Sequence, residues 1–196
     1  GWDYLQSELE KKKYIWFVTS STAGNGILIA INKNTRIDYT DICNYNPPGY
    51  VLNNEILLGI DVPDFYEIRV KHNKTLFSII GVRIRKDIYR TNPNYSINQF
   101  ALLDNYLSNL NHNVICIGDF NAYWAGTWNT NRNFALPKTS SNYTLYTPPY
   151  NPIDGFSYVE PGGSKLQLDH LITNIKCKRV EVNYDWDFIN NLNGYG

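Results

Sequence analysis

Short apolar runs punctuate the chain, and their spacing predicts a protein rich in β-strands. The runs contain many β-branched and aromatic residues and are bounded by Gly, Pro, Asn or Asp, which is typical of strands. The expected strands cover residues 14–19, 26–31, 36–42, 55–62, 66–71, 75–85, 114–117, 166–173 and 178–183. Residues 72–74 predict a hairpin connection, and residues 44–52, with Pro47-Pro48-Gly49, predict a loop.

Two segments have the 3.6-residue spacing of helices instead. Residues 2–12 predict a short surface helix. Ser96 is a suitable capping residue for a second helix, whose expected apolar face comprises Ile97, Phe100, Leu103, Tyr106, Leu107 and Leu110. Residues 123–152 are rich in Asn, Thr, Ser and Pro and predict loops with a short helix near residues 131–136.

Length and composition predict one folded domain. The 196 residues suffice for a sizeable core, and with 43% hydrophobic and 18% charged residues the chain does not resemble a disordered protein. No internal repeat or linker divides residues 1–196. The 18 basic and 18 acidic residues balance, so an overall basic footprint for nucleic acid is absent, and only a local basic patch stays open.

Cysteine usage and hydropathy favour a cytoplasmic protein. Cys43, Cys116 and Cys177 are widely spaced, and their odd number argues against a disulfide framework, so we expect reduced thiols. No apolar stretch reaches the length of a membrane span, and no signal-peptide pattern opens the chain. We therefore expect no membrane partner, and nothing in the sequence indicates a protein partner.

The strongest chemical signal follows the apolar run at residues 114–117. That run stops at Gly118, and Asp119 and Asn121 come next. The carboxyl end of a buried strand is where an α/β fold presents polar groups to a ligand. Asp can take a proton from water there, and Asn can donate a hydrogen bond to a developing anion. The alternative is an ordinary polar turn, since Gly, Asp and Asn are common turn residues.

The string Gly118-Asp119-Phe120-Asn121-Ala122 after an apolar strand resembles the endonuclease/exonuclease/phosphatase family. A second match, Leu166-Gln167-Leu168-Asp169-His170-Leu171-Ile172, resembles the family's strand in which an Asp is continued by aliphatic residues. The resemblance implies an α/β fold, a four-layer sandwich of two packed mixed β-sheets flanked by helices. It also implies cleavage of phosphate esters that depends on Mg²⁺, with Mn²⁺ as an alternative ion.

The resemblance assigns roles to three residues. Asp119 matches the acid that positions or deprotonates the attacking water, and it is the expected metal ligand. Asn121 matches the amide that holds the phosphate and that water. Asp169 matches the acid that orients a catalytic histidine. His170 is its neighbour on a strand, so it should point to the opposite face and pack there rather than catalyse.

Arg83 and Arg85 are candidate phosphate-binding residues. Strand alternation places the Arg83 side chain on the other face of the strand from the apolar Val82 and Ile84. We expect Arg83 to face the same site as Asp119. The family carries a His or Tyr where Arg83 stands. Arg can clamp a phosphate with bidentate donors, but it cannot act as an acid near neutral pH. The alternative is an edge strand with solvated cations.

Aromatic and histidine residues elsewhere carry weaker signals. Trp124 and Trp128 follow the Asp119 turn and could stack on bases or plug the loop onto the core; the second role is the more common. His72 and His112 lie in predicted turns, and we expect both at the surface.

Two family motifs are missing from the chain. The family has a strand ending in Gln-Glu, whose Glu binds magnesium, and a final Ser-Asp-His motif that supplies the catalytic histidine. Residues 5–8, Leu-Gln-Ser-Glu, match the first motif only superficially and are expected on a helix surface. We therefore expect a domain truncated at both termini, and a fragment that is inactive alone.

Two functions from different classes follow from the sequence. The first is a metal-dependent phosphodiesterase, most simply a nuclease. The second is a catalytically dead member of the family that binds nucleic acid or a protein. A Trp near the Gly-Asp-Phe-Asn-Ala turn resembles retrotransposon endonucleases and tilts the expected partner to DNA, while lipid and inositol phosphates stay open as substrates.

Overall fold

The computed structural model describes residues 2–18, 27–35, 37–43, 50–52, 55–57, 63–84, 95–121, 142–146, 155–159, 161–163 and 165–176. The helices in this part are α1 (Trp2–Lys11) and α2 (Tyr95–Ser108). The strands are β1 (Tyr14–Val18), β2 (Leu28–Asn32), β3 (Asp38–Cys43), β4 (Tyr50–Leu52), β5 (Glu55–Leu57), β6 (Asp64–His72), β7 (Thr75–Arg83), β8 (Asn113–Asp119), β9 (Thr144–Tyr146), β10 (Tyr158–Val159), β11 (Lys165–Leu166) and β12 (Asp169–Thr173).

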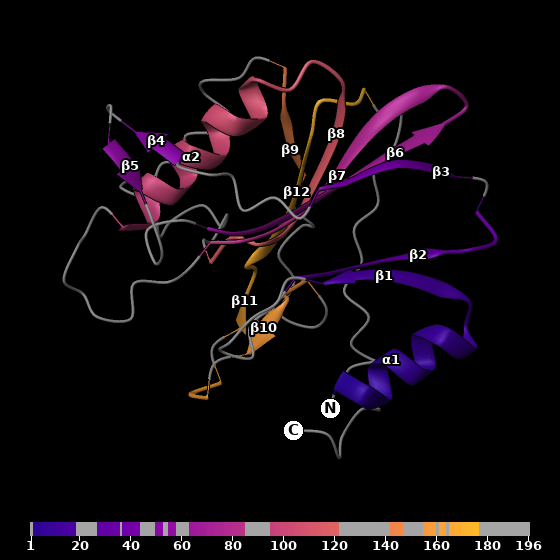
Figure 1. Ribbon diagram of the computed structural model, residues 1–196. Helices are drawn as coiled ribbons and strands as arrows, with labels where there is room; N and C mark the ends of the chain where they lie inside the picture. Colours follow the sequence, from indigo (N-terminus) through magenta and orange to yellow (C-terminus); the bar gives the residue numbers. More distant parts are fainter. Residues whose placement is uncertain are drawn as a thin grey trace.

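A six-stranded mixed sheet forms the centre of the molecule, with the strand order β3-β6-β7-β8-β12-β9 (Figure 1). Strands β7 and β8 run parallel, and every other neighbouring pair in this sheet is antiparallel. The parallel pair arises because α2 connects β7 to β8, and a parallel connection needs such a crossover. Strands β8 and β12 are direct neighbours, as the two apolar runs with their acids predict.

Helix α2 covers one face of this sheet through the apolar stripe that its spacing predicts. Phe100, Leu103 and Leu107 are buried against Ile80 and Val82 of β7. Further members of this cluster come from β8 and β12, namely Val114, Cys116 and Ile172. Burial of this stripe, rather than intrinsic helix propensity, is what stabilises an amphipathic helix of this kind.

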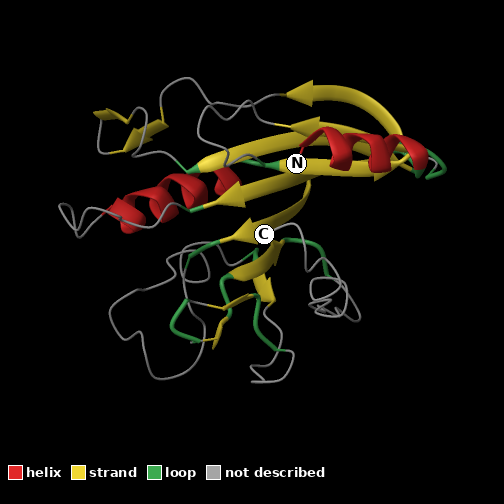
Figure 2. Ribbon diagram, turned by 90° about the horizontal axis from the view of Figure 1, so that it is seen from below, coloured by secondary structure: helices red, strands yellow, loops and turns green. Residues whose placement is uncertain are grey.

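The opposite face of the sheet packs on a second, two-stranded sheet formed by β1 and β2. Ile31 of β2 and Ile68 of β6 belong to the buried cluster between the two sheets, with Phe17, Ile29 and Ile79 packed against it. Helix α1 lies on the outer side of β1 and β2, and the view from below shows it in front of the strands (Figure 2). The order helix, sheet, sheet, helix confirms the predicted four-layer sandwich.

Several element boundaries differ from the sequence-based expectation. Strand β4 falls within the predicted loop at residues 44–52, and the short strands β9, β10 and β11 were either unpredicted or only partly predicted. Tertiary pairing creates these short strands, and a two- or three-residue strand has too little pattern to reveal itself. The expected helix at residues 131–136 and strand at residues 178–183 lie outside the described residues.

The β6–β7 hairpin has a tighter turn than predicted. His72 pairs with Thr75, so the connection comprises the two residues Asn73 and Lys74 rather than residues 72–74. Asn73 and Lys74 both have positive φ, at 49° and 67°, which is the backbone of the turn that matches strand twist in two-residue hairpins. Because register follows from the turn, this one-residue difference decides which side chains face each other along both strands.

Neither helix in the described part of the chain is long and apolar enough to cross a membrane. Cys116 is a free and fully buried thiol in the core beneath α2. Burial raises the pKa of this thiol, so Cys116 is an inert packing residue rather than a nucleophile.

Candidate active site

Three charged residues line up across neighbouring strands at one end of the central sheet. Arg83 is in register with Asp119 in the parallel β7–β8 pair, and Asp119 is in register with Asp169 in the antiparallel β8–β12 pair. Residues paired in this way lie on the same face, with the strands about 4.8 Å apart. The structure therefore brings together Arg83, Asp119 and Asp169, which lie far apart in the sequence.

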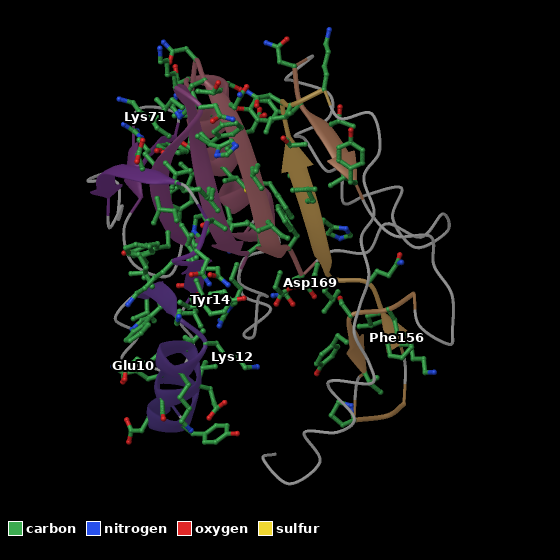
Figure 3. The ribbon with its side chains drawn as sticks, turned by 90° about the vertical axis from the view of Figure 1, so that its right-hand side faces the viewer. Glu10, Lys12, Tyr14, Lys71, Phe156 and Asp169 are labelled. Atoms are coloured by element: carbon green, nitrogen blue, oxygen red, sulfur yellow. The ribbon has the colours of Figure 1, made fainter. Side chains whose placement is uncertain are left out.

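This row lies on the sheet face that packs toward β1 and β2, away from α2. Arg83 alternates with the buried Val82 and Ile84, which belong to the core under α2. Figure 3 shows Asp169 at one end of the sheet and Lys71 at the other. The row thus occupies the end where β7 and β8 finish and β12 begins, which is the carboxyl edge of the parallel pair.

Hydrogen bonds hold the turn after β8 in a fixed shape. The backbone N–H of Asn121 donates to Asp119 Oδ1 at 2.8 Å, and Asn121 Nδ2 donates to Asp119 Oδ2 at 3.2 Å and to the carbonyl of Ile84 at 2.6 Å. The N–H of Phe120 donates to the Leu168 carbonyl at 2.7 Å. The turn is therefore tied to the end of β7 and to the start of β12, and both oxygens of the Asp119 carboxylate are oriented.

Glycine at position 118 lets β8 reach this turn. Its φ is +156°, and a Cβ on Gly118 would lie 1.9 Å from the backbone oxygen of Val82. No side chain fits in that space, so the Gly of the Gly-Asp-Phe-Asn string allows close approach of two backbones just before the candidate catalytic acid.

The Asp119 carboxyl has a pKa of about 6, well above the ordinary value for Asp. Burial is the main cause, because it disfavours the charged form, and the nearby Asp169 carboxylate adds to the effect. The hydrogen bond from the Asn121 backbone and the charge of Arg83 act in the opposite direction. A carboxylate with a pKa near neutrality is suited to accept a proton from water.

Arg83 is held by an acid on the neighbouring strand. Its Nε lies 3.4 Å from Oδ2 of Asp64, which is paired with Arg83 in the β6–β7 register. The side chains are 30% and 17% exposed, respectively, so this ion pair is partly sheltered from solvent. Asp64 extends the row to four strands: Asp64, Arg83, Asp119 and Asp169.

Sequence reasoning missed Asp64 because the strand was predicted to begin at residue 66. The feature that would locate Asp64 is the length of the turn between β6 and β7. With Asn73 and Lys74 as a two-residue turn, counting back along both strands places residue 64 opposite residue 83, as observed. The turn type therefore decides that Asp64 faces Arg83, and the local pattern at residues 72–74 did not settle that turn type.

The oxygen donors at this edge fit one side of a magnesium site. Asp119 and Asp169 supply carboxylates, and Mg²⁺ is commonly held in proteins by one or two carboxylates together with substrate phosphates and water. Within the described ranges, no group of three or more His, Cys, Asp and Glu residues gathers at a metal-binding distance.

The remaining predicted site residues fall in different places. His170 is buried at 1% exposure on the α2 face and packs on the ring of Phe120, so the prediction that it packs rather than faces the acids is confirmed. Arg85, Trp124 and Trp128 lie outside the described residues. His72 is exposed, as predicted, but it ends a strand rather than forming the turn.

The prediction that His112 lies at the surface is wrong. His112 is half-buried, and its Nε2 is 2.5 Å from Ser78 Oγ. Ser78 Oγ donates its one proton to Glu67 Oε1 at 2.5 Å, and Tyr106 donates to the other Glu67 oxygen. Arg69 Nε completes this buried polar cluster at 2.9 Å from Glu67. The turn pattern around His112 could not reveal this because its partners come from β6, β7 and α2.

Comparison with solved structures identifies the fold. TDP2 of D. rerio, complexed with single strand DNA product, matches with a TM-score of 0.59 at 13% identity, over 93% of this chain and 71% of that one. A mannosyl-6-phosphatase of Bacteroides thetaiotaomicron matches with a TM-score of 0.60 at 12% identity, over 88% and 67%. The human Nocturnin catalytic domain with bound sulfate anion matches at 0.53 and 15% identity, over 88% and 64%.

This chain has the endonuclease/exonuclease/phosphatase fold. A protein of that family from Bacteroides thetaiotaomicron also matches, with a TM-score of 0.55 at 11% identity, over 88% of this chain and 65% of that one. No family model matches the sequence. No curated protein matches it either. At these identities the agreement is one of fold, and it agrees with the resemblance of the Gly-Asp-Phe-Asn-Ala string.

Proposed function

We propose that this chain is part of a metal-dependent phosphodiesterase, most simply a nuclease that hydrolyses DNA. The observation that carries the proposal is the in-register row of Arg83, Asp119 and Asp169 beside the Asn121 turn. A cation for a phosphate, a carboxylate with a pKa near 6 and a second carboxylate meet at the carboxyl edge of the parallel strands. The chain spans 64–71% of the solved structures compared above, so the proposal concerns the activity of the whole protein.

The residues divide the chemistry of phosphodiester hydrolysis between them. Asp119 takes a proton from the attacking water, and Asn121 keeps both oxygens of that carboxylate oriented. Arg83 binds the non-bridging oxygens of the phosphate, where its planar donors suit a bidentate contact. Such a site works mainly by positioning and by neutralising charge, because phosphoryl transfer asks little covalent chemistry of the protein.

A divalent cation belongs to this proposal. Asp119, with Asp169 beside it, would hold Mg²⁺ or Mn²⁺ through carboxylate oxygens. When bound, the ion would supply positive charge against the negative charge that develops on the phosphate. Asp169 has a second effect in the metal-free protein, since its charge contributes to the raised pKa of Asp119.

The solved structures support a phosphate-ester substrate without defining it. TDP2 is complexed with single strand DNA product, and Nocturnin carries a sulfate anion, which has the tetrahedral shape of phosphate. The mannosyl-6-phosphatase is named for its action on a phosphorylated sugar, so the fold serves more than one phosphate ester. We propose DNA as the substrate because the Gly-Asp-Phe-Asn-Ala turn with a nearby Trp resembles retrotransposon endonucleases.

The experiment is cleavage of a labelled plasmid and a labelled oligonucleotide by the full-length protein. A lipid phosphodiester is included as a second substrate class. We expect cleavage of DNA in Mg²⁺ or Mn²⁺, loss of cleavage on chelation, and a loss of about 10²–10⁴-fold in single-turnover rate for Asp119→Asn. Asp3→Asn, an exposed substitution on α1, is the matched control and should cleave at the parental rate. Equal rates for the parent and Asp119→Asn would exclude Asp119 as the base.

A catalytically dead binding protein is the second candidate. Arg83 favours it, because an arginine stands where the family carries a His or Tyr, and arginine does not donate protons near neutral pH. This candidate predicts that the folded, metal-loaded protein cleaves no phosphodiester. It also predicts that DNA binding persists and that Arg83→Gln weakens it.

A further inference from the structure

We propose that Asp64 is a positioning residue that holds the Arg83 guanidinium ready for a phosphate group at the end of β7. The inference rests on the proposed function, since it concerns how that phosphate site is built. It concerns a residue for which neither the sequence motifs nor the likeness in fold suggests a role.

The geometry places the two side chains in direct contact. Asp64 begins β6 and Arg83 ends β7, and the two residues are directly opposite in the antiparallel ladder. Asp64 Oδ2 is 3.4 Å from Arg83 Nε, and the Asp64 side chain is only 17% exposed. Contact through Nε engages one edge of the planar guanidinium. The two terminal nitrogens form the other fork, which is the one that binds a phosphate in bidentate fashion.

The charges around Arg83 explain why the ion pair with Asp64 is needed to position the guanidinium. Asp119 lies on the next strand on the other side of Arg83, and Asp169 lies one strand further. These two carboxylates attract the guanidinium toward themselves, where it would occupy the oxygens that the proposed reaction uses. Asp64 pulls from the opposite side, so Arg83 stays between β6 and β8 instead of collapsing onto Asp119.

Asp64 also brings a negative charge close to the proposed phosphate, and this effect opposes binding. Asp64 is one strand away from Arg83 and two strands away from Asp119, about 4.8 and 9.6 Å at the usual strand spacing, and the phosphate on the free fork of Arg83 lies between these distances. Across about 7 Å, near the surface and at physiological salt, repulsion changes affinity by only about two-fold. Loss of a well-placed bidentate donor has the larger effect, so removal of Asp64 should weaken phosphate binding overall.

The test is a double-mutant cycle on binding of inorganic phosphate by the 196-residue chain, in a chelator and without metal. Binding is followed by ³¹P NMR titration for the wild type, Asp64→Ala, Arg83→Gln and the double variant. Asp64→Asn keeps an oxygen that can accept from Arg83 Nε and serves as the conservative variant. Asp38→Ala, exposed at the opposite end of the same sheet and in register with Lys71, is the matched control.

We expect Asp64→Ala to weaken phosphate binding by about 3- to 10-fold when Arg83 is present. In the Arg83→Gln background, where Asp64→Ala removes only the charge repulsion, it should leave binding unchanged or tighten it by up to about two-fold. Asp64→Asn should recover part of the loss, and Asp38→Ala should bind as the wild type does. A positioning role acts through Arg83, whereas a purely structural role of Asp64 would weaken binding in both backgrounds. Thermal unfolding of each variant verifies that the compared proteins are folded.

Equal losses in both backgrounds, no loss for either Asp64 variant, or tighter binding by Asp64→Ala when Arg83 is present would overturn the inference. Absence of phosphate binding by the wild type would overturn it as well. The cleavage assay separates this result from the proposed function. A full-length protein that cleaves no phosphodiester, together with a coupled Asp64–Arg83 cycle, refutes the enzyme and leaves the phosphate-positioning role standing.

Discussion

Asp119 places a carboxylate where the surrounding structure opposes its charge. The group is largely buried and is paired in register with a second acid, Asp169. The hydrogen bond from the Asn121 backbone and the charge of Arg83 compensate only in part, because the pKa is still raised to about 6. Local destabilisation of this kind is common where function, rather than folding, selects a residue.

Replacement of Asp119 by Asn should therefore stabilise the metal-free protein at pH 7.5, by about 1 kcal/mol. The folded pKa lies above the unfolded one, so the folded state binds more protons between about pH 4 and pH 6. The stability of the wild type then falls as pH rises through that window. Asn carries no charge and should not show this fall.

Chemical denaturation at pH 4 and pH 7.5 measures this effect. The difference between the variant and the wild type should nearly vanish at pH 4, where Asp119 is protonated in the folded protein. Asp3→Asn, on the exposed face of α1, should change stability at neither pH. A less stable Asp119→Asn at pH 7.5 would show that the hydrogen bonds of the carboxylate outweigh its desolvation.

Gly118 is a backbone requirement of the site. Gly118→Ala would place a methyl group 1.9 Å from the Val82 carbonyl oxygen, and a backbone atom cannot rotate away as a side chain can. We expect a loss of about 3 kcal/mol in the free energy of unfolding, through separation of β7 and β8 at the site. Gly162→Ala, where a Cβ meets nothing within 4 Å, is the matched control and should be near neutral.

At the level of elements, a buried polar cluster fastens α2 and the α2–β8 connection to the sheet. Glu67 is fully buried and accepts hydrogen bonds from Ser78 of β7, Tyr106 of α2 and Arg69 of β6. Burial alone would raise the pKa of Glu67, but these hydrogen bonds together outweigh it and lower the pKa. The carboxylate therefore stays charged, and each donor that it keeps matters to stability.

Two tyrosines, Tyr106 on α2 and Tyr143 just before β9, test how much the charge of Glu67 strengthens the hydrogen bond that it accepts. Tyr106→Phe removes a donor from a buried carboxylate and should cost about 1.5–3 kcal/mol. Tyr143→Phe removes a 2.8 Å hydrogen bond to the neutral Leu107 carbonyl and should cost about 0.5–1.5 kcal/mol. Denaturant unfolding of both variants gives the comparison. An equal loss of unfolding free energy in the two variants would mean that the charge of Glu67 does not strengthen its hydrogen bond from Tyr106.

On the scale of the whole molecule, the described residues of the sandwich form two separate buried clusters. One lies between α2 and the central sheet, and the other lies between that sheet and the β1–β2 layer. Within the described residues, β1 and β2 pair only with each other, so this layer is attached to the rest through side-chain packing. A two-stranded sheet is marginal by itself, and the inter-sheet cluster must provide its stability.

Substitution of two isoleucines on neighbouring strands, followed by amide hydrogen exchange, should show whether the two clusters open independently. Ile68→Ala opens the inter-sheet cluster, and Ile80→Ala opens the cluster beneath α2; each should cost about 2–5 kcal/mol. Ile68→Ala should speed exchange of the β1 and β2 amides more than that of the β7 and β8 amides. Ile80→Ala should lack this selectivity. Uniform acceleration by Ile68→Ala would show that both layers open together.

The chain predicts its own elements well wherever the pattern is long and regular. The α2 stripe and the apolar β8 run that stops at Gly118 occupy their expected places, whereas the strand predicted over residues 166–173 is divided into β11 and β12. Strand alternation alone predicts that Arg83 lies on the other sheet face from Val82 and Ile84, as observed. These inferences need only neighbours in sequence, because a periodic pattern is recorded within a single element.

What local pattern could not decide is which residues face each other across strands. A two-residue turn at Asn73 and Lys74 sets Asp64 against Arg83, and pairing of β7, β8 and β12 sets Arg83, Asp119 and Asp169 in one row. The raised pKa of Asp119 and the buried charge of Glu67 also belong to this level. Burial and electrostatic neighbours come from segments distant in the chain. The sequence therefore identifies the types of residue that form the candidate site. Their charge states and their partners are determined only when the sheet forms.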